Sequence, residues 1–373
     1  MNSKKVVFIT NIPSPYRVDM FYYIQTHISE LDFSVIYTST GDANRQWSVE
    51  QDKIRKSYFL KSKVIHIKND MDVRSIHIPS RIAPVLNKIK PEVVIAMEYN
   101  PAALKSLVWC KLHKVPFIHL TDGTLYSERD IGRVQKWARR IICKYADAFI
   151  ASSTKSKEKL MAWGVEEREI FVSLLTEDIT RFADMVRESI PGRILYVGSM
   201  VKRKGLDLLI DALGDVEKEY ELRIVGNGTE KECDQLKKLA IEKGVDQYIV
   251  WCGFKEGKAL IDEYRRAQVF VLPTREDCYG LVLLEAMCSG LPVVASKYAD
   301  GAYDIVRDGV NGYIVDPYDK KELASAINKA MGEKKFYENS NGSFYEGFLF
   351  KNTVQGYLEA INYAMKKRNR YTI

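Results

Sequence analysis

Two short segments in the C-terminal half combine glycines and charged side chains in an order that suits the binding of a phosphate and of a ligand hydroxyl. The first, residues 197–205, reads V-G-S-M-V-K-R-K-G and follows an apolar run typical of a strand. Backbone N–H groups and the dipole at the start of a helix favour a phosphate, and Lys204 would add a full positive charge. A strand-to-helix loop with ordinary surface lysines is the alternative interpretation.

The second segment, residues 273–287, again passes from a strand end through a loop into a helix. Ligands of open α/β sheets bind beyond the carboxyl ends of the strands, where we expect this loop. Gly280 lets the backbone approach a ligand closely, and Asp277 lies in the loop. Glu285 stands inside an otherwise apolar helix, where a carboxylate needs a ligand hydroxyl or a partner. A structural ion pair with a neighbouring Lys or Arg is the alternative.

The elements that must position these residues are indicated by two series of short apolar runs. Longer amphipathic or mixed segments separate the runs, a rhythm typical of βαβ units on a parallel sheet. The first series comprises residues 6–9, 33–37, 64–67, 93–97, 117–120 and 149–151. The second comprises residues 194–197, 222–225, 249–251, 269–272, 293–295 and 313–315. The sequence therefore predicts two doubly wound α/β domains.

The domain boundaries follow from length and composition. A chain of 373 residues is too long for one hydrophobic core. We expect an N-terminal domain over 1–178, a polar hinge over 179–192 and a C-terminal domain over 193–350, with a cleft between the domains. A terminal helix over 351–373 is expected to pack back across the boundary. Its apolar residues at helical spacing are Val354, Leu358, Ile361 and Met365.

Composition narrows the class of protein. No apolar run approaches the roughly 20 residues of a membrane-spanning helix, and the start of the chain reads as a strand, not a signal peptide. The six cysteines form no CxxC pair, which favours a reducing, cytoplasmic setting over disulfides or zinc. The net charge of +7 favours acidic partners, but no nucleic-acid-binding motif accompanies it.

Residues 285–296, E-A-M-C-S-G-L-P-V-V-A-S, and 306–315, V-R-D-G-V-N-G-Y-I-V, resemble the family 4 retaining glycosyltransferases. The turn at 226–228, the pair at 253–254 and the run D-A-F-I-A-S-S at 147–153 agree with this. The resemblance is strong over 193–331 and weaker before. It implies the GT-B fold, two Rossmann-like domains with a nucleotide diphosphate sugar held on the C-terminal domain.

The resemblance also implies roles for single residues. Glu285 matches the glutamate that binds the donor ribose, and Lys204 matches the lysine that holds the diphosphate. Asp277 stands where a glutamate that contacts the donor sugar is usual, with seven residues between it and Glu285, and His119 resembles a histidine near that sugar. These four are the expected catalytic residues. The other expected donor-binding residues are Gly198, Ser199, Arg203, Gly226, Gly253, Phe254, Glu276, Cys278, Tyr279, Gly280 and Leu281.

Two positions depart from the family pattern. Ser199 stands where an arginine usually follows the glycine of the phosphate loop, and Asp277 replaces the usual glutamate. The diphosphate charge would then rest on Lys204, helped by Lys202 or Arg203. Glu276 could take the acidic role if the loop shifts by one residue. For His119, a structural role at a strand end is the alternative.

The acceptor side is expected on the N-terminal domain. The loop at 9–17 resembles the acceptor loop of polysaccharide-assembling family members, although prolines replace the glycines common there. A proline-rich loop without a binding role is the alternative. Glu98 and Tyr99, which end another expected strand, are expected to face the same cleft. The expected acceptor-side residues are Pro13, Ser14, Pro15, Tyr16, Arg17, Glu98 and Asp122.

A basic stripe at helical spacing adjoins Trp137 and Ile141. A stripe of this kind suits an anionic membrane surface, and a solvated helix face is the alternative. Its members are Arg133, Lys136, Arg140 and Lys144.

The resemblance implies retaining transfer of a sugar, from a UDP-sugar by our hypothesis, to a glycan or lipid-linked glycan in cell-surface polysaccharide assembly. It implies no metal and no cofactor, because Lys204 and helix N-termini meet the charge on the departing diphosphate. The protein is expected in the cytoplasm, on the inner face of the membrane if the stripe binds lipid. A catalytically silent nucleotide-sugar-binding scaffold of the same fold is the main alternative, and an epimerase or phosphorylase is a third.

Overall fold

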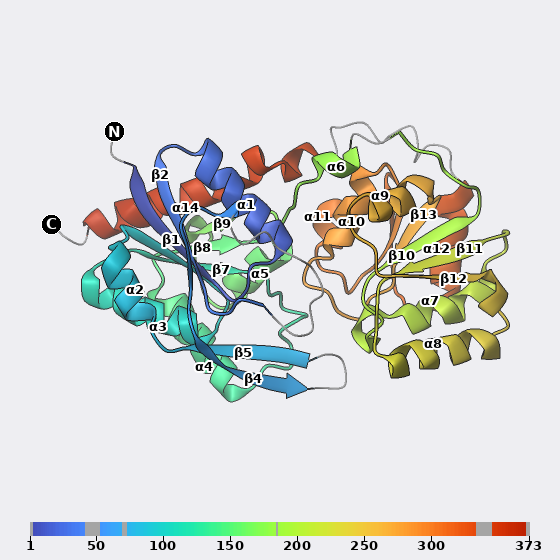
Figure 1. Ribbon diagram of the computed structural model, residues 1–373, viewed down its shortest axis with the longest axis horizontal. Helices are drawn as coiled ribbons and strands as arrows, with labels where there is room; N and C mark the ends of the chain where they lie inside the picture. Colours follow the sequence, from blue (N-terminus) through green and yellow to red (C-terminus); the bar gives the residue numbers. More distant parts are fainter. Residues whose placement is uncertain (1–2, 42–52, 69–72, 184–185, 333–344, 371–373) are drawn as a thin grey trace. The chain divides into compact units, whose positions relative to one another are not determined.

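The computed structural model describes residues 3–41, 53–68, 73–183, 186–332 and 345–370 (Figure 1). Residues 184–185 of the expected hinge and 371–373 of the expected terminal helix lie outside this part. The chain divides into two compact units, one with the described residues up to 178 together with 348–370, and one over 179–347.

The first unit is built on a seven-stranded, all-parallel sheet in the order β3-β2-β1-β6-β7-β8-β9. Its strands are β1 (Lys4–Thr10), β2 (Leu31–Tyr37), β3 (Ser57–Phe59), β6 (Val93–Met97), β7 (Phe117–Thr121), β8 (Ala148–Ala151) and β9 (Ile170–Val172). Its helices before residue 178 are α1 (Pro15–His27), α2 (Ile82–Ile89), α3 (Pro101–His113), α4 (Arg133–Tyr145) and α5 (Thr154–Ala162). Val6 and Phe8 belong to one core and Val7 and Ile9 to another, because helices cover both faces of the sheet.

The terminal helix α14 (Phe350–Arg370) returns to the first unit. Tyr357, Ala360 and Ile361 are buried in the same core as Phe8, and the helix packs on β8, β9 and α1. Helical periodicity predicted a buried face here, but Leu358 and Met365 are only partly buried.

One predicted strand of the first series is placed elsewhere. The run 64–67 lies in β4 (Ser62–Lys68), which pairs antiparallel with β5 (Val73–Pro79) in a separate two-stranded sheet. The prediction that this run joins the parallel sheet is therefore wrong. Val64 and Ile65 are exposed, whereas the strands of a parallel sheet are buried on both faces.

The second unit is built on a six-stranded, all-parallel sheet in the order β12-β11-β10-β13-β14-β15. Its strands are β10 (Arg193–Val197), β11 (Glu221–Val225), β12 (Ile249–Gly253), β13 (Val269–Leu272), β14 (Val293–Ser296) and β15 (Gly312–Val315). Its helices are α6 (Thr180–Ala183), α7 (Leu206–Ala212), α8 (Glu230–Glu242), α9 (Gly257–Arg266), α10 (Leu281–Cys288), α11 (Ala302–Ile305) and α12 (Lys320–Gly332). The prediction of two doubly wound, Rossmann-like units is confirmed.

Strand order locates a switch point in each sheet. The order reverses between β1 and β6 in the first unit and between β10 and β13 in the second. At such a point the loops leave in opposite directions and open a crevice at the carboxyl ends of the strands, where ligands of this fold bind. No helix in the described part of the chain is long and apolar enough to cross a bilayer.

Candidate functional site

The two loops at the switch point of the second unit are bound to each other. The backbone N–H of Arg275 and the hydroxyl of Thr274 both donate to the carbonyl of Arg203, at 2.8 and 2.9 Å. Gly205, with φ +70°, lies so close to the carbonyl of Pro273 that a Cβ would stand 2.0 Å from that oxygen. The loop after β10 is therefore held against the loop after β13 by contacts that only glycine allows.

Glycines also end three neighbouring strands of this sheet. The N–H of Gly198 donates to Val225 and the N–H of Gly226 donates to Gly253, both at 2.9 Å. A Cβ on Gly226 would come within 1.9 Å of the carbonyl of Gly198. These turns stack closely and leave backbone, not side chains, at the sheet edge, which is the surface that a phosphate or a base can approach.

Lys204 and Asp277 meet across the switch point. The Lys204 ammonium, in the 3-10 turn Lys202–Lys204, donates to the Asp277 carboxylate at 2.5 Å, and both side chains are largely buried. Burial alone would raise the pKa of Asp277, but the charges of Lys204 and Arg203 and the N–H of Tyr279 hold that pKa below its ordinary value. The sequence predicted both residues as site residues, and the structure makes them an ion pair.

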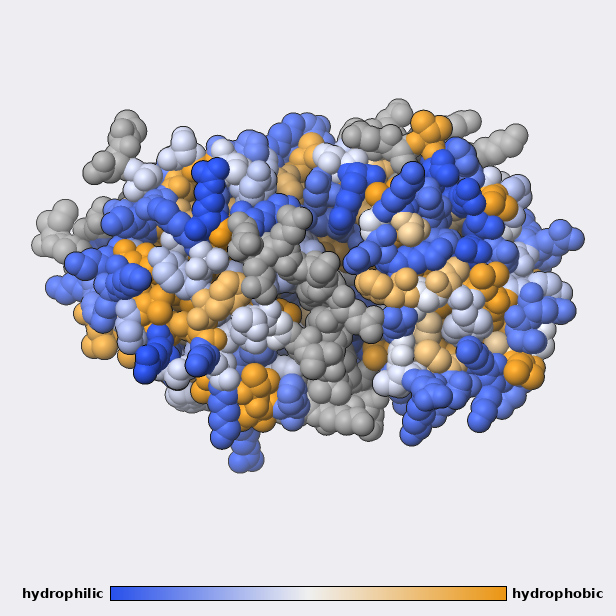
Figure 2. Space-filling model, in the orientation of Figure 1, coloured by the Kyte–Doolittle hydropathy of each residue, from blue (hydrophilic) through white to orange (hydrophobic). Residues whose placement is uncertain are grey.

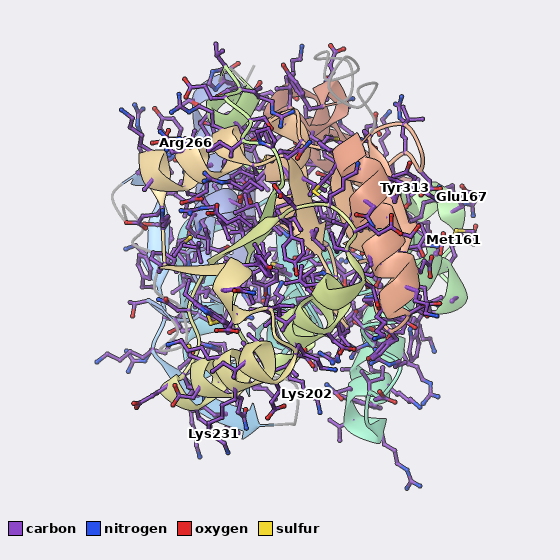
Figure 3. The ribbon with its side chains drawn as sticks, turned by 90° about the vertical axis from the view of Figure 1, so that its right-hand side faces the viewer. Met161, Glu167, Lys202, Lys231, Arg266 and Tyr313 are labelled. Atoms are coloured by element: carbon purple, nitrogen blue, oxygen red, sulfur yellow. The ribbon has the colours of Figure 1, made fainter. Side chains whose placement is uncertain are left out.

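The other cations of the two loops have different partners. The guanidinium of Arg203 donates to the carbonyl of Glu276 at 2.8 Å, so it braces the second loop. Arg275 forms a bidentate pair with Asp207, at 2.7 Å to each oxygen, and also donates to Lys202. Ser199 and Lys202 are exposed, and Figure 3 labels Lys202 at the surface of the second unit.

Glu285 lies on α10, partly buried, and accepts a 2.7 Å hydrogen bond from the hydroxyl of Tyr264 on α9. Within the described residues no Lys or Arg forms an ion pair with it. The structural ion pair considered as an alternative is therefore absent there. One carboxylate oxygen is held by a neutral donor, and such a carboxylate keeps capacity to accept further hydrogen bonds.

Four other expected donor-side residues lie at the start of α10. Gly280, with φ +80°, precedes this helix, and Cys278 and Tyr279 come just before it. Leu281 is its first residue. Phe254 follows β12 and is exposed, so its ring is free to stack on a flat group.

In the first unit, the loop after β1 leads into α1 with Pro13 and Ser14 buried and Pro15 at the first helical position. Arg17 is buried, and its Nη2 donates to both carboxylate oxygens of Asp122, at 2.7 and 3.0 Å. Tyr16 lies partly buried beside it. Two of the expected acceptor-side residues are thus bound to each other.

Three further side chains contact either Arg17 or Asp122. Ser152, at the end of β8, donates to it, and Tyr357 of α14 accepts from Arg17 at 3.1 Å. Glu98, after β6, takes the N–H of Asp122 at 2.8 Å while holding a positive φ of 62°. Burial and the nearby Asp122 charge raise the pKa of Glu98 to about 7.

The structure corrects the expectation for His119. β7 continues to Thr121, so His119 lies inside the strand and not at its end. Its ring is fully buried, 4.3 Å from the ring of Tyr99, and neither ring nitrogen has a hydrogen-bond partner among the described residues. Burial lowers its pKa, so the imidazole is neutral. Thr121 and Asp122 occupy the strand end that the sequence assigned to the histidine.

Sequence reasoning missed the partners that hold these groups. Tyr264, Asp207, Ser152 and Tyr357 lie between 21 and 340 positions from the residues they contact. No local pattern marks them. Among the described residues, no three His, Cys, Asp or Glu side chains gather as a metal site would require.

Comparison with known proteins covers both units. The family model described as Glycosyl transferases group 1 matches residues 186–343, and the model described as Glycosyltransferase Family 4 matches residues 27–173. An uncharacterised glycosyltransferase of Methanocaldococcus jannaschii is 26% identical over 286 residues, which span 70% of this chain and 72% of the relative. A lipopolysaccharide 1,6-galactosyltransferase of Salmonella typhimurium is 27% identical over 218 residues, or 56% of this chain and 60% of the relative.

Solved structures agree over nearly the whole chain. The lipopolysaccharide outer core galactosyltransferase WaaB, in its apo form, has a TM-score of 0.72 at 18% identity and covers 95% of this chain and 99% of its own. The Anabaena protein HepE, in complex with UDP and glucose, has a TM-score of 0.74 at 16% identity, with 96% and 99% covered. These likenesses establish the GT-B fold.

Proposed function

The chain belongs to the group 1 and family 4 glycosyltransferases, and from this premise we propose that it transfers a hexose from a UDP-sugar to a glycan or lipid-linked glycan, with retention at the anomeric carbon. The observation that carries the proposal is the ion pair of Lys204 and Asp277 at the switch point of the second unit. A diphosphate needs a cation at this place, and a sugar hydroxyl needs an acceptor.

The donor would lie along the glycine turns. Lys204 and the N–H groups at the start of α10 would receive the diphosphate, and Glu285 would accept hydrogen bonds from the ribose. Negative charge grows on the diphosphate as the glycosidic bond breaks, so a fixed cation there stabilises the transition state more than the ground state. The proposal therefore needs no metal ion and no cofactor. HepE, which has the same fold, has been solved with UDP and with UDP-glucose, and this favours a uridine nucleotide.

The acceptor would meet the switch point of the first unit. Asp122 and Glu98 present carboxylate oxygens there, which suits the hydroxyl groups of a sugar. Relatives named as lipopolysaccharide galactosyltransferases favour a role in building a cell-surface polysaccharide. We propose that the protein does so on the cytoplasmic side of the membrane.

A nucleotide-sugar-binding scaffold without activity remains the second candidate, because Ser199 stands where the family has an arginine and Asp277 already neutralises Lys204. The test separates binding from transfer. Thermal unfolding is measured with UDP-glucose, UDP-galactose, GDP-mannose and ADP-glucose, since a ligand that binds the folded state raises Tm. Release of UDP is then measured with a glycan acceptor. Stabilisation by a UDP-sugar with UDP release supports the transferase, and stabilisation without any turnover supports the scaffold.

A further inference from the structure

Two helices of the first unit expose large apolar side chains on their outer faces. On α4, Val134 is 78% exposed and Trp137 is 54% exposed; on α3, Val108 is 59% and Leu112 is 76% exposed. The two helices pack against each other and lie side by side at the lower edge of that unit in Figure 1. Their opposite faces are buried in the core beneath them. Each of the two neighbouring helices thus exposes large apolar side chains to solvent.

The charge on the same helices has one sign. Neither α3 nor α4 contains an Asp or Glu, although 49 of the 373 residues are acidic. Four exposed cations of α4 have no ion pair with any described residue, whereas Arg139, on the inner side, pairs with Glu128 at 2.6 Å. The four are Arg133, Lys136, Arg140 and Lys144. The positive charge is therefore available to a partner.

Helix α8 of the second unit shows what an ordinary solvated helix of this chain looks like. It has the same length as α4, but it carries acidic residues among its lysines, and Ile241 is its one large apolar side chain among the exposed ones. Figure 2 shows hydrophobic and hydrophilic side chains interspersed over the region of α3 and α4. A solvated face has no need of an exposed tryptophan between unpaired cations.

We propose that the outer faces of α3 and α4 form a docking surface for an anionic lipid bilayer. The indole of Trp137 suits the boundary between headgroups and acyl chains, and the long stems of Lys and Arg let their charges reach lipid phosphates while Val134 and Leu112 enter the apolar layer. A bilayer fits better than an acidic protein, because the apolar groups are dispersed among cations and form no continuous hydrophobic patch. The proposal does not depend on the donor or the reaction proposed above.

The test is sedimentation of the full chain with vesicles of phosphatidylcholine, with and without phosphatidylglycerol, at low ionic strength. Binding is expected only with the anionic lipid and is expected to weaken as salt is added. Reversal of Arg133, Lys136 and Arg140 to Glu should weaken it about a hundredfold or more, since each cation near an anionic surface contributes about a factor of five.

The matched control reverses three exposed lysines of α8, Lys231→Glu, Lys237→Glu and Lys238→Glu, an equal change in net charge on the other unit; Figure 3 labels Lys231 on that helix. This control should retain most of the binding. Vesicles should also shift tryptophan emission to shorter wavelength, and Trp137→Phe should remove that shift while leaving the fold unchanged by circular dichroism.

Four results would overturn the proposal. They are no sedimentation with anionic vesicles at low salt, an equal loss of binding in the α8 control, unchanged affinity of the α4 reversal variant, and vesicle binding without any change in the emission of Trp137. Binding of the sugar donor is measured without vesicles, so its outcome tests the proposed function independently of the membrane proposal.

Discussion

The ion pair of Lys204 and Asp277 allows a quantitative prediction, because the proposed function gives both residues a role in binding the donor. Their charged atoms are 2.5 Å apart and their side chains are 17% and 14% exposed, so water and salt screen the pair less than a surface pair. A charged hydrogen bond of this kind is worth about 1.5–3 kcal/mol. A double-mutant cycle of Lys204→Met and Asp277→Asn should therefore give a coupling of about 2 kcal/mol in urea unfolding.

The same two variants should have opposite effects on the affinity for UDP. Lys204→Met removes the cation and should weaken UDP by roughly tenfold to a hundredfold. Asp277→Asn releases Lys204 from its carboxylate and removes a negative charge near the diphosphate, so UDP should bind several-fold tighter while sugar transfer falls. Calorimetric titration of UDP measures both. Weaker UDP binding in Asp277→Asn, or a coupling below about 0.5 kcal/mol, would refute this reasoning.

The pair also sets a pH dependence. The folded pKa of Asp277 is lowered, so its contribution to stability is fully present above the unfolded value of about 3.9 and is lost as pH falls through the folded pKa. Asp277→Asn should therefore lose less stability than the wild type on acidification below pH 4. Urea unfolding at a series of pH values measures the difference.

Four further predictions concern other groups. Glu285→Gln should weaken UDP at least several-fold with little change in Tm, and a large loss of Tm at unchanged UDP affinity would instead indicate a structural role. Activity should survive EDTA, and loss restored by manganese or magnesium would contradict the metal-free mechanism. Ser199→Arg should raise the affinity for UDP, because it adds a second cation. An unchanged affinity for UDP would indicate that Lys202 or Arg203 already reaches the diphosphate. The pKa of Glu98 is raised to about 7 from its ordinary value near 4.5, so its burial as a neutral acid favours folding below pH 4.5 and this contribution is lost as pH rises to about 7. Glu98→Gln should remove that decline, and an unchanged pH profile of urea unfolding would show that Glu98 does not titrate in this range.

The sequence by itself determined most of the sheets. Parallel strands are buried on both faces, so each of them needs a continuous apolar run, and those runs were visible at β1, β2, β6, β7 and β8 and in all six strands of the second unit. Because loops at the carboxyl ends of such strands meet at the switch point, the segments carrying Lys204 and Asp277 could be assigned to one edge. The run 64–67 within β4 led to a wrong prediction, because the exposed antiparallel ribbon has an apolar run similar to that of a buried parallel strand.

Only the tertiary structure decided how these groups pair and how deeply they lie. Lys204 and Asp277 are 73 positions apart, and Arg17 and Asp122 are 105 apart, so no local pattern predicts their contact. His119 is polar and near a strand end, yet the neighbouring strands β6 and β8 enclose it. Periodicity showed that α14 buries one face, but the choice of the first unit as its partner depends on the shape of a core to which strands β1, β7 and β8 and helix α1 contribute, all far from α14 in the sequence. Local spacing determines which residues share a face, whereas burial and pairing depend on the whole chain.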